Sequence, residues 1–314
     1  GLVDANETFH RIEVEGLRPG VEYEYVLVAR HIVQFEPYKI IWGDTVGSAA
    51  LQFTMPESDA DSVRFTVLND LHKNVGLIRQ LFTMVEARAE LPEFVMLNGD
   101  ILSHINDESD ILSIFDLPGS YASEHPTIWV RGNHECRGRF ARYMRRYLAM
   151  PDGRYYYTFR RGPVQMLVLD CGEDKTDDHK EYSGLNDFES FRKQEEAWFR
   201  AVLESNEWKN APWRVLVVHI PLEKGTVNAS VTPDSYRYRW AEMMEKAGVD
   251  LELAAHYHRV NFTDRSEKQG FPILIGGGPD GSAVAFHVAA NASTLEVEMT
   301  DAEGKSLKKQ AWRH

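Results

Sequence analysis

Aspartate, asparagine and histidine side chains follow five apolar runs of the sequence, at the point where each run ends. In chain order they are Asp70, His72, Asp100, Asn133, His219, His256 and His258. Imidazole and carboxylate groups are the ligands that first-row divalent metals such as Mn, Fe, Zn and Ni prefer. The chain has only 2 cysteines, which argues against a thiolate site. The residue types therefore predict a metal centre.

The number of candidate ligands favours two metal ions. A single four-coordinate zinc ion does not need seven ligands, whereas two ions that share a bridging carboxylate do, and Asp100 is the natural bridge. Two metals about 3.5–4 Å apart suit in-line displacement at phosphorus, because they lower the pKa of bound water towards roughly 7 and so supply hydroxide as the nucleophile. Any one of the 12 histidines is more often structural than catalytic, so the prediction depends on the five segments together.

The apolar runs are expected to be strands of an α/β domain, with helices between them. The expected strands cover 63–68, 94–97, 128–130, 164–169, 215–218 and 251–255, and the expected helices cover 74–90, 108–116, 138–149, 188–205 and 234–247. Residues 271–312 return to a β pattern. In open α/β folds, ligands bind outside the carboxyl ends of the strands. We therefore expect the candidate ligands to converge at one edge.

The first 58 residues have a different texture. Residues 9–55 contain the β-prone stretches 9–14, 23–33 and 49–53, show no helical period, and precede a polar linker at 56–61. We expect an all-β module at 1–58 and a second domain at 59–314. The module is short for a complete sandwich and the chain lacks an initiator Met, as expected if a signal peptide or leading segment has been removed.

The charge balance argues against several kinds of partner. Lys and Arg total 35 against 48 Asp and Glu, for a formal net charge of −13, whereas nucleic-acid and anionic-membrane surfaces depend on clustered cations. A small phosphorylated substrate is compatible, because bound metal ions dominate the local field. No run approaches the roughly 18 apolar residues that a membrane helix needs. The oligomeric state is not predicted.

The order of the motifs closely resembles that of the calcineurin-like metallophosphoesterases. The chain has Asp-x-His at 70–72, Gly-Asp at 99–100, Gly-Asn-His-Glu at 132–135, His at 219 and His-x-His at 256–258. The resemblance covers about residues 62–300 and implies a four-layer α/β/β/α sandwich that hydrolyses phosphoesters. It implies one metal held by Asp70, His72, Asp100 and His258, and a second held by Asp100, Asn133, His219 and His256.

The resemblance also implies how the residues near the metals divide the work. His134 matches the family's non-ligand histidine, which orients the phosphate and protonates the leaving group, a role suited to an unperturbed pKa near 6.5. Asp100 is expected to be catalytic together with His134. Asn133 and His134 are expected to contact the substrate. His104 is a further candidate for substrate contact, with a solvated loop position as the alternative. Gly132 is expected to let the backbone turn off its strand.

The N-terminal segment resembles the back half of the fibronectin-type-III-like module of purple acid phosphatases, through Leu17-Arg18-Pro19-Gly20 and Tyr23. Two departures from those enzymes matter. Ser103 stands where they have a tyrosine iron ligand, and His72 is present where they lack the histidine. A generic site is therefore preferred, with two divalent or trivalent ions of Mn, Fe, Zn or Ni. By analogy with these enzymes, a secreted or periplasmic location is expected.

Several alternatives stay open. Glu135 either hydrogen-bonds a ligand histidine or pairs with an arginine. A solvated helix face is preferred to a phosphate site for the arginines that follow it, which are Arg137, Arg139, Arg142, Arg145 and Arg146. Whether Cys136 and Cys171 pair is undecided. Monoester and diester substrates are both possible, and the competing function is an inactive binding or adhesive protein with a phosphoesterase-like domain, which the complete ligand set disfavours.

Overall fold

Two six-stranded β-sheets dominate the computed structural model, which describes residues 2, 5–57 and 59–314. The first sheet consists of β5 (Ser62–Leu68), β6 (Phe94–Asn98), β7 (Thr127–Val130), β14 (Val284–Asn291), β15 (Thr294–Asp301) and β16 (Ser306–Arg313). Its strand order is β16-β15-β14-β5-β6-β7, with β5, β6 and β7 parallel. The parallel strands are those that precede the Asp-x-His, Gly-Asp and Gly-Asn-His-Glu motifs.

The second sheet carries the remaining motifs. It consists of β8 (Tyr157–Arg161), β9 (Val164–Leu169), β10 (Trp213–Val218), β11 (Leu251–Ala254), β12 (Asn261–Thr263) and β13 (Ile273–Ile275). The order is β12-β13-β11-β10-β9-β8, and β9, β10, β11 and β13 run parallel. His219 follows β10, and His256 and His258 follow β11.

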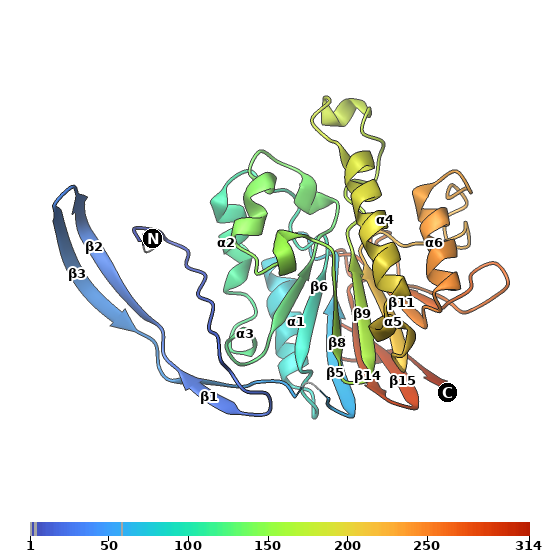
Figure 1. Cartoon of the computed structure of the whole chain (residues 1–314), viewed down its shortest axis with the longest axis horizontal. Helices are drawn as coiled ribbons and strands as arrows, with labels where there is room; N and C mark the ends of the chain where they lie inside the picture. Colours follow the sequence, from blue (N-terminus) through green and yellow to red (C-terminus); the bar gives the residue numbers. More distant parts are fainter. Residues whose placement is uncertain (1, 3–4, 58) are drawn as a thin grey trace.

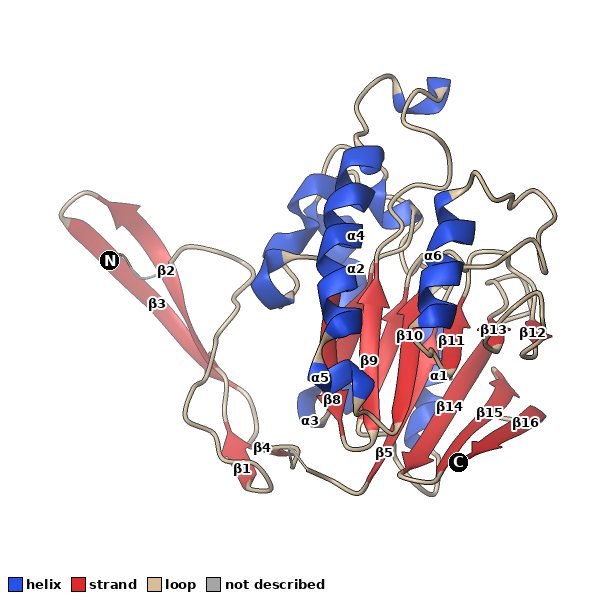
Figure 2. Cartoon of the chain, turned by 45° about the vertical axis from the view of Figure 1, so that its right-hand side comes forward, coloured by secondary structure: helices blue, strands red, loops and turns tan. Residues whose placement is uncertain are grey.

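Helices cover the outer faces of both sheets (Figures 1 and 2). The helices are α1 (Val75–Glu86), α2 (Glu108–Phe115), α3 (Tyr121–Glu124), α4 (Phe188–Glu204), α5 (Asn206–Lys209) and α6 (Tyr236–Lys246). The first three pack on the first sheet and the last three on the second. This arrangement confirms the four-layer α/β/β/α sandwich. None of the helices in the described ranges is long and apolar enough to cross a bilayer.

Strand β9 shows why these runs are continuously apolar. All six of its residues are buried. Val164, Met166 and Val168 pack in the core between the two sheets, while Leu167 and Leu169 pack against the helical layer. Because successive side chains of a strand point to opposite faces, a strand buried on both faces needs apolar residues at nearly every position.

The segment at 138–149 differs from the expectation of a helix, since it forms only a 3-10 turn at Ala141–Arg146. Ala141, Met144 and Leu148 are buried, and their spacing is the signal that suggested a helix. The N–H of Phe140 donates to the carbonyl of Ile105 at 2.9 Å, which ties the start of the segment to a loop on another part of the chain. Tertiary contact therefore overrides the local pattern.

The N-terminal segment is all-β, as expected, although its strands differ in detail. They are β1 (Glu22–Tyr25), β2 (Val28–Glu36), β3 (Lys39–Gly47) and β4 (Leu51–Thr54). β1 pairs with β4, and β2 pairs with β3 in a hairpin that projects from the body (Figure 1). The expected stretch at 9–14 forms no strand, and β3 lies outside the expected stretches. Residues 1, 3, 4 and 58 of the expected module lie outside the described residues.

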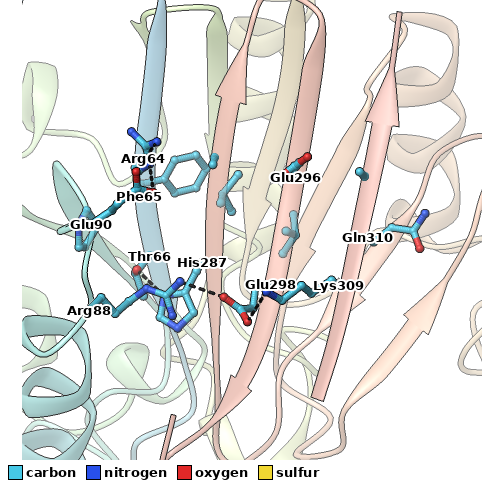
Figure 3. Close-up of a pocket in the computed structure, with 15 residues that line it drawn as sticks. Arg64, Phe65, Thr66, Arg88, Glu90, His287, Glu296, Glu298, Lys309 and Gln310 are labelled. Atoms are coloured by element: carbon cyan, nitrogen blue, oxygen red, sulfur yellow. Dashed lines mark hydrogen bonds and ion pairs between the residues drawn. The ribbon is translucent and has the colours of Figure 1, made fainter. Parts of the chain in front are cut away.

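A hollow of about 380 Å³ lies on the outer face of the first sheet, beside the end of α1 (Figure 3). The carboxylate of Glu298 accepts a hydrogen bond from Arg88 Nη2 at 2.9 Å, and Lys309 Nζ lies 3.1 Å from its other oxygen. The charged groups around this carboxylate are therefore paired with one another.

His287 lies at the floor of this hollow and is neutral. Its Nδ1 is 2.9 Å from the hydroxyl of Thr66, and its Nε2 is 3.0 Å from that of Thr300. Burial, together with the positive charge of Arg88, lowers the pKa of His287 to about 3. A neutral imidazole has one donor and one acceptor nitrogen, so the two threonines can satisfy both without a charge.

Acid should weaken the fold through His287. The folded pKa is about 3 and the unfolded value is near 6.5, so the neutral ring stabilises the fold above about pH 6.5, and this stabilisation is lost as the pH falls towards 3. We expect the stability advantage of wild type over His287→Gln to shrink by about 2 kcal/mol between pH 7.5 and pH 5. Urea denaturation at the two pH values measures it, and an unchanged difference would contradict the assignment.

Candidate metal centre

The carboxyl ends of β5, β6, β7, β10 and β11 meet at one edge of the sandwich, where all seven predicted ligands come together. Asp70, His72, Asp100 and His258 form one group, whose ligand atoms all lie within 4.8 Å of one another. A second group with the same limit consists of Asp100, His219 and His256. Asn133 joins the second group, because its Oδ1 is 2.9 Å from His256 Nδ1. The division matches the two ligand sets that the family resemblance implies.

Two unpaired buried atoms indicate that the cluster suits a cation. Asp70 Oδ1 and His219 Nε2 are buried and have no hydrogen-bond partner among the described residues. A buried polar atom left without a partner costs about 1–3 kcal/mol. His219 Nε2 lies 3.9 Å from Asp70 Oδ1 and 3.0 Å from Asp100 Oδ2. A metal ion between these atoms would satisfy them, and imidazole, carboxylate and amide donors are compatible with first-row metals.

Asp100 and His219 shift each other's pKa in opposite directions. Burial disfavours the charge of the Asp100 carboxylate, but attraction to His219 lowers its pKa below the ordinary range. Burial likewise disfavours a charged His219, yet Asp100 raises the pKa of His219 to about 10. His219 Nδ1 lies 2.9 Å from the carbonyl of Asn98 and donates to it, which leaves Nε2 facing the cluster. Without a metal ion, a proton on Nε2 would point at the cluster. A metal ion bound by His219 would take the place of this proton.

The backbone at the cluster is strained. Asp70, His72, Asp100, His256 and His258 all have positive φ, between 45° and 73°. Residues other than glycine rarely adopt this conformation, and it persists where the surroundings determine it, as at ligand clamps. The turns after β5, β6 and β11 therefore hold five of the seven candidate ligands in strained conformations at the cluster.

Glu135 has a role that differs from both expected alternatives. Its buried carboxylate accepts hydrogen bonds from the backbone N–H groups of Asp100, Leu102 and Gly132, each at 2.8 Å. Burial, followed by the negative charge of Asp100, raises the pKa of Glu135 to about 7. Glu135 thus joins the loops after β6 and β7, and within the described residues its carboxylate has no hydrogen bond or ion pair with a histidine or an arginine.

His134 lies beside the cluster and belongs to neither ligand group. Its backbone N–H donates to Asp100 Oδ1 at 2.9 Å, and its Nδ1 lies 2.8 Å from the carbonyl of Ser103. Its ring meets that of His72 edge to face, with centroids 4.7 Å apart. His104 is exposed in the loop that follows β6, and its contact with substrate stays a prediction.

Arg137 makes contacts beside the cluster that its sequence pattern did not indicate. Its Nη1 lies 2.9 Å from His134 Nε2, and its other nitrogens bind Glu173. The expectation of a solvated helix face is therefore wrong for Arg137. The two cysteines do not pair, since Cys136 and Cys171 are both free thiols.

Position 132 requires glycine because the structure leaves no room there for a side chain. A Cβ at this position would lie 2.3 Å from Asp100 Oδ1 and 2.4 Å from Asp100 N. Its φ is outside the left-handed region, so the expectation that glycine is required to turn the backbone is corrected. Gly99 combines both constraints, with φ +75° and a Cβ that would lie 2.4 Å from His219 Nδ1.

Comparison with known proteins identifies the family. A family model described as calcineurin-like phosphoesterase matches residues 63–260. The phosphoenolpyruvate phosphatase of Allium cepa is 23% identical over 283 residues, covering 82% of this chain and 54% of that protein. Purple acid phosphatase 22 of Arabidopsis thaliana is 24% identical over 226 residues, covering 59% of this chain and 48% of that protein. The chain thus spans about half the length of these curated relatives.

A solved structure shows the same fold. The purple acid phosphatase isolated from yellow lupin (Lupinus luteus) seeds superposes with a TM-score of 0.66 at 14% identity. The match covers 94% of this chain and 60% of that one. The chain is therefore similar in fold to this structure over most of its length.

Adding one methyl group at Gly132 should disrupt the cluster. Because the Cβ would clash with the backbone and carboxylate of Asp100, we expect Gly132→Ala to lose affinity for Mn²⁺ at least tenfold and to lose about 1–3 kcal/mol of unfolding free energy. Titration calorimetry and urea denaturation measure the two effects. Gly76→Ala is the matched control, since the nearest atom to its Cβ would be 3.7 Å away. Wild-type Mn²⁺ affinity in Gly132→Ala would contradict the packing argument.

Proposed function

Because the chain belongs to the calcineurin-like phosphoesterase family, we propose that it is a phosphoester hydrolase that works with two metal ions. One observation carries the proposal: two groups of ligand atoms, each within 4.8 Å, share the carboxylate of Asp100. One carboxylate common to two clusters is the arrangement expected for paired ions in in-line displacement at phosphorus.

The proposed ligands follow the two groups. The first ion would be held by Asp70, His72, Asp100 and His258, and the second by Asp100, Asn133, His219 and His256. When bound, these ions would supply a hydroxide nucleophile near neutral pH and offset the charge that develops on the phosphoryl oxygens. The identity of the ions is left among Mn, Fe, Zn and Ni.

His134 is the proposed residue for orienting the phosphoryl group and protonating the leaving oxygen. It lies beside the shared carboxylate, with Nε2 3.9 Å from Asp100 Oδ2. Its other ring nitrogen is held by the carbonyl of Ser103, so the ring is fixed with Nε2 towards the cluster. Asn133 and, at the rim, His104 are the proposed further contacts with the substrate, a small phosphoester.

The organisation of the chain belongs to the same proposal. We place a β module at 1–58 before a catalytic domain at 59–314, which is supported by the two small separate sheets formed by β1–β4. A secreted or periplasmic location is proposed from the likeness to purple acid phosphatases.

Removing the charge of the shared carboxylate tests the metal assignment. We expect wild type to bind two equivalents of Mn²⁺ and Asp100→Asn to lose most of them, because both groups use Asp100. Elemental analysis after desalting measures the content, and the exposed Asp116→Asn is the control. Two full equivalents in Asp100→Asn would contradict the shared position.

Removing His134 should separate chemistry from metal binding. We expect His134→Ala to keep its metal and to lose turnover by roughly 10²–10⁴-fold, the usual contribution of a general acid. The assay uses aryl phosphomonoesters and diesters on protein loaded with Mn, Fe or Ni, with His31→Ala on the projecting hairpin as the control. An unchanged rate would refute the role of His134. Failure of the wild type to hydrolyse either substrate above the metal-only background would refute the function itself.

A further inference from the structure

Arg137 is held along one edge of its guanidinium by the loop that follows β9. Its Nε lies 3.0 Å from Glu173 Oε1, and its Nη2 lies 2.9 Å from Glu173 Oε2. Glu173 is 2% exposed, and Tyr182 Oη donates to its Oε2 at 3.1 Å. Paired hydrogen bonds between a guanidinium and a carboxylate are directional, so this contact determines where the rest of the arginine points.

The other edge of the guanidinium points at the catalytic histidine. Arg137 Nη1 lies 2.9 Å from His134 Nε2. A guanidinium has only donors, so Nε2 must accept this bond, and the ring proton must lie on Nδ1, which donates to the carbonyl of Ser103 at 2.8 Å. His134 Nε2 is in turn 3.9 Å from the shared carboxylate of Asp100. The Nη1 donor therefore ends next to the metal-ligand cluster.

A neutral imidazole nitrogen is a weak partner for this donor compared with a phosphoryl oxygen. The bond to the imidazole nitrogen has a charge on the donor alone, whereas a bond to a phosphoryl oxygen would join opposite charges, and the planar guanidinium suits phosphate geometry. The pairing with Glu173 leaves Nη1 free to exchange partners without losing its orientation.

The neighbouring arginines lack this arrangement. Arg139 Nε donates to the carbonyl of Asn106, and Arg142 Nη1 donates to the carbonyl of Arg139, both at exposed positions. Among the hydrogen bonds of these three arginines within the described residues, only the one from Arg137 reaches a residue of the proposed site.

We propose that Arg137 is a substrate-binding residue whose Nη1 passes from His134 Nε2 to a phosphoryl oxygen when a phosphorylated substrate binds. The exchange frees Nε2 of His134 to take up a proton from solvent, which the ring then donates to the leaving oxygen in its proposed role as the acid. Through Glu173, it also connects the loop at 172–182 to recognition of the phosphoryl group. The inference rests on the proposed function, because it places the phosphoryl group at the metal centre.

Binding of inorganic phosphate tests the proposal without turnover. On Mn-loaded protein of measured metal content, we expect Arg137→Ala to weaken phosphate binding roughly 10- to 100-fold, the effect of losing one hydrogen bond between charged groups. Arg137→Lys keeps the charge but loses the paired contacts with Glu173, so its phosphate affinity should lie between those of wild type and Arg137→Ala. It also serves as the test if the alanine variant does not fold. Arg142→Ala is the matched control and should bind phosphate as wild type does. Titration calorimetry measures all four proteins.

Kinetics distinguish a phosphoryl contact from a structural ion pair. The loss in kcat/KM for Arg137→Ala should be larger for an aryl phosphomonoester than for the diester, because a monoester dianion carries twice the charge. Added guanidinium ion should restore part of the lost rate in Arg137→Ala and should leave the rate of Arg142→Ala unchanged. Equal losses for both esters without rescue, or wild-type phosphate affinity in Arg137→Ala, would overturn the assignment.

The outcomes separate this inference from the proposed function. If wild type hydrolyses phosphoesters and Arg137→Ala matches it in rate and phosphate affinity, the inference fails and the function stands. If wild type binds phosphate through Arg137 but hydrolyses no phosphoester, the function fails and the contact stands. If metal-loaded wild type neither binds phosphate nor hydrolyses either ester, both are overturned.

Discussion

The carboxylate of Glu135 accepts hydrogen bonds from three backbone N–H groups just past the ends of β6 and β7. The geometry of the candidate metal centre depends on these three bonds. Asp100, Leu102 and Gly132 donate to it. Beyond the end of a strand, a backbone N–H loses its partner in the sheet and needs another acceptor when it is buried. By supplying that acceptor, Glu135 holds the loop that bears Asp100 against the loop that bears Asn133 and His134.

The two sheets contribute different candidate ligands, so the packing of the sheets sets the distance between these side chains. Asp70, His72, Asp100 and Asn133 follow strands of the first sheet, and His219, His256 and His258 follow strands of the second. Directly beneath the cluster, Asn98 Nδ2 lies 3.2 Å from the carbonyl of Val218 and 3.3 Å from that of Leu253. This side chain at the end of β6 connects the two sheets where their ligands meet. The strained turns thus follow strands whose ends are tied together by hydrogen bonds between the two sheets.

Metal binding and substrate recognition are assigned to different parts of the fold. The candidate metal ligands lie just past buried strands, whereas Arg137 and Glu173 lie in the segments that follow β7 and β9. Loops tolerate changes in length and sequence that strands do not, so recognition placed on them can change while the metal centre is kept. Arg137 connects His134, which lies beside the candidate ligands, to Glu173 in the loop after β9.

Local patterns in the sequence predicted most of the elements and the order of the candidate ligand motifs. Apolar runs such as 164–169 are local signals, and each motif lies within a few residues of the strand that positions it, so the α/β fold and all seven candidate ligands were predictable. The contacts between distant residues, in contrast, become visible only in the folded chain. Arg137 and Glu173 are 36 residues apart and look like ordinary surface charges, and the pattern at 138–149 suggested a helix although packing produces a 3-10 turn. The spacing of residues along the chain does not encode which distant groups meet, because that depends on how the two sheets pack.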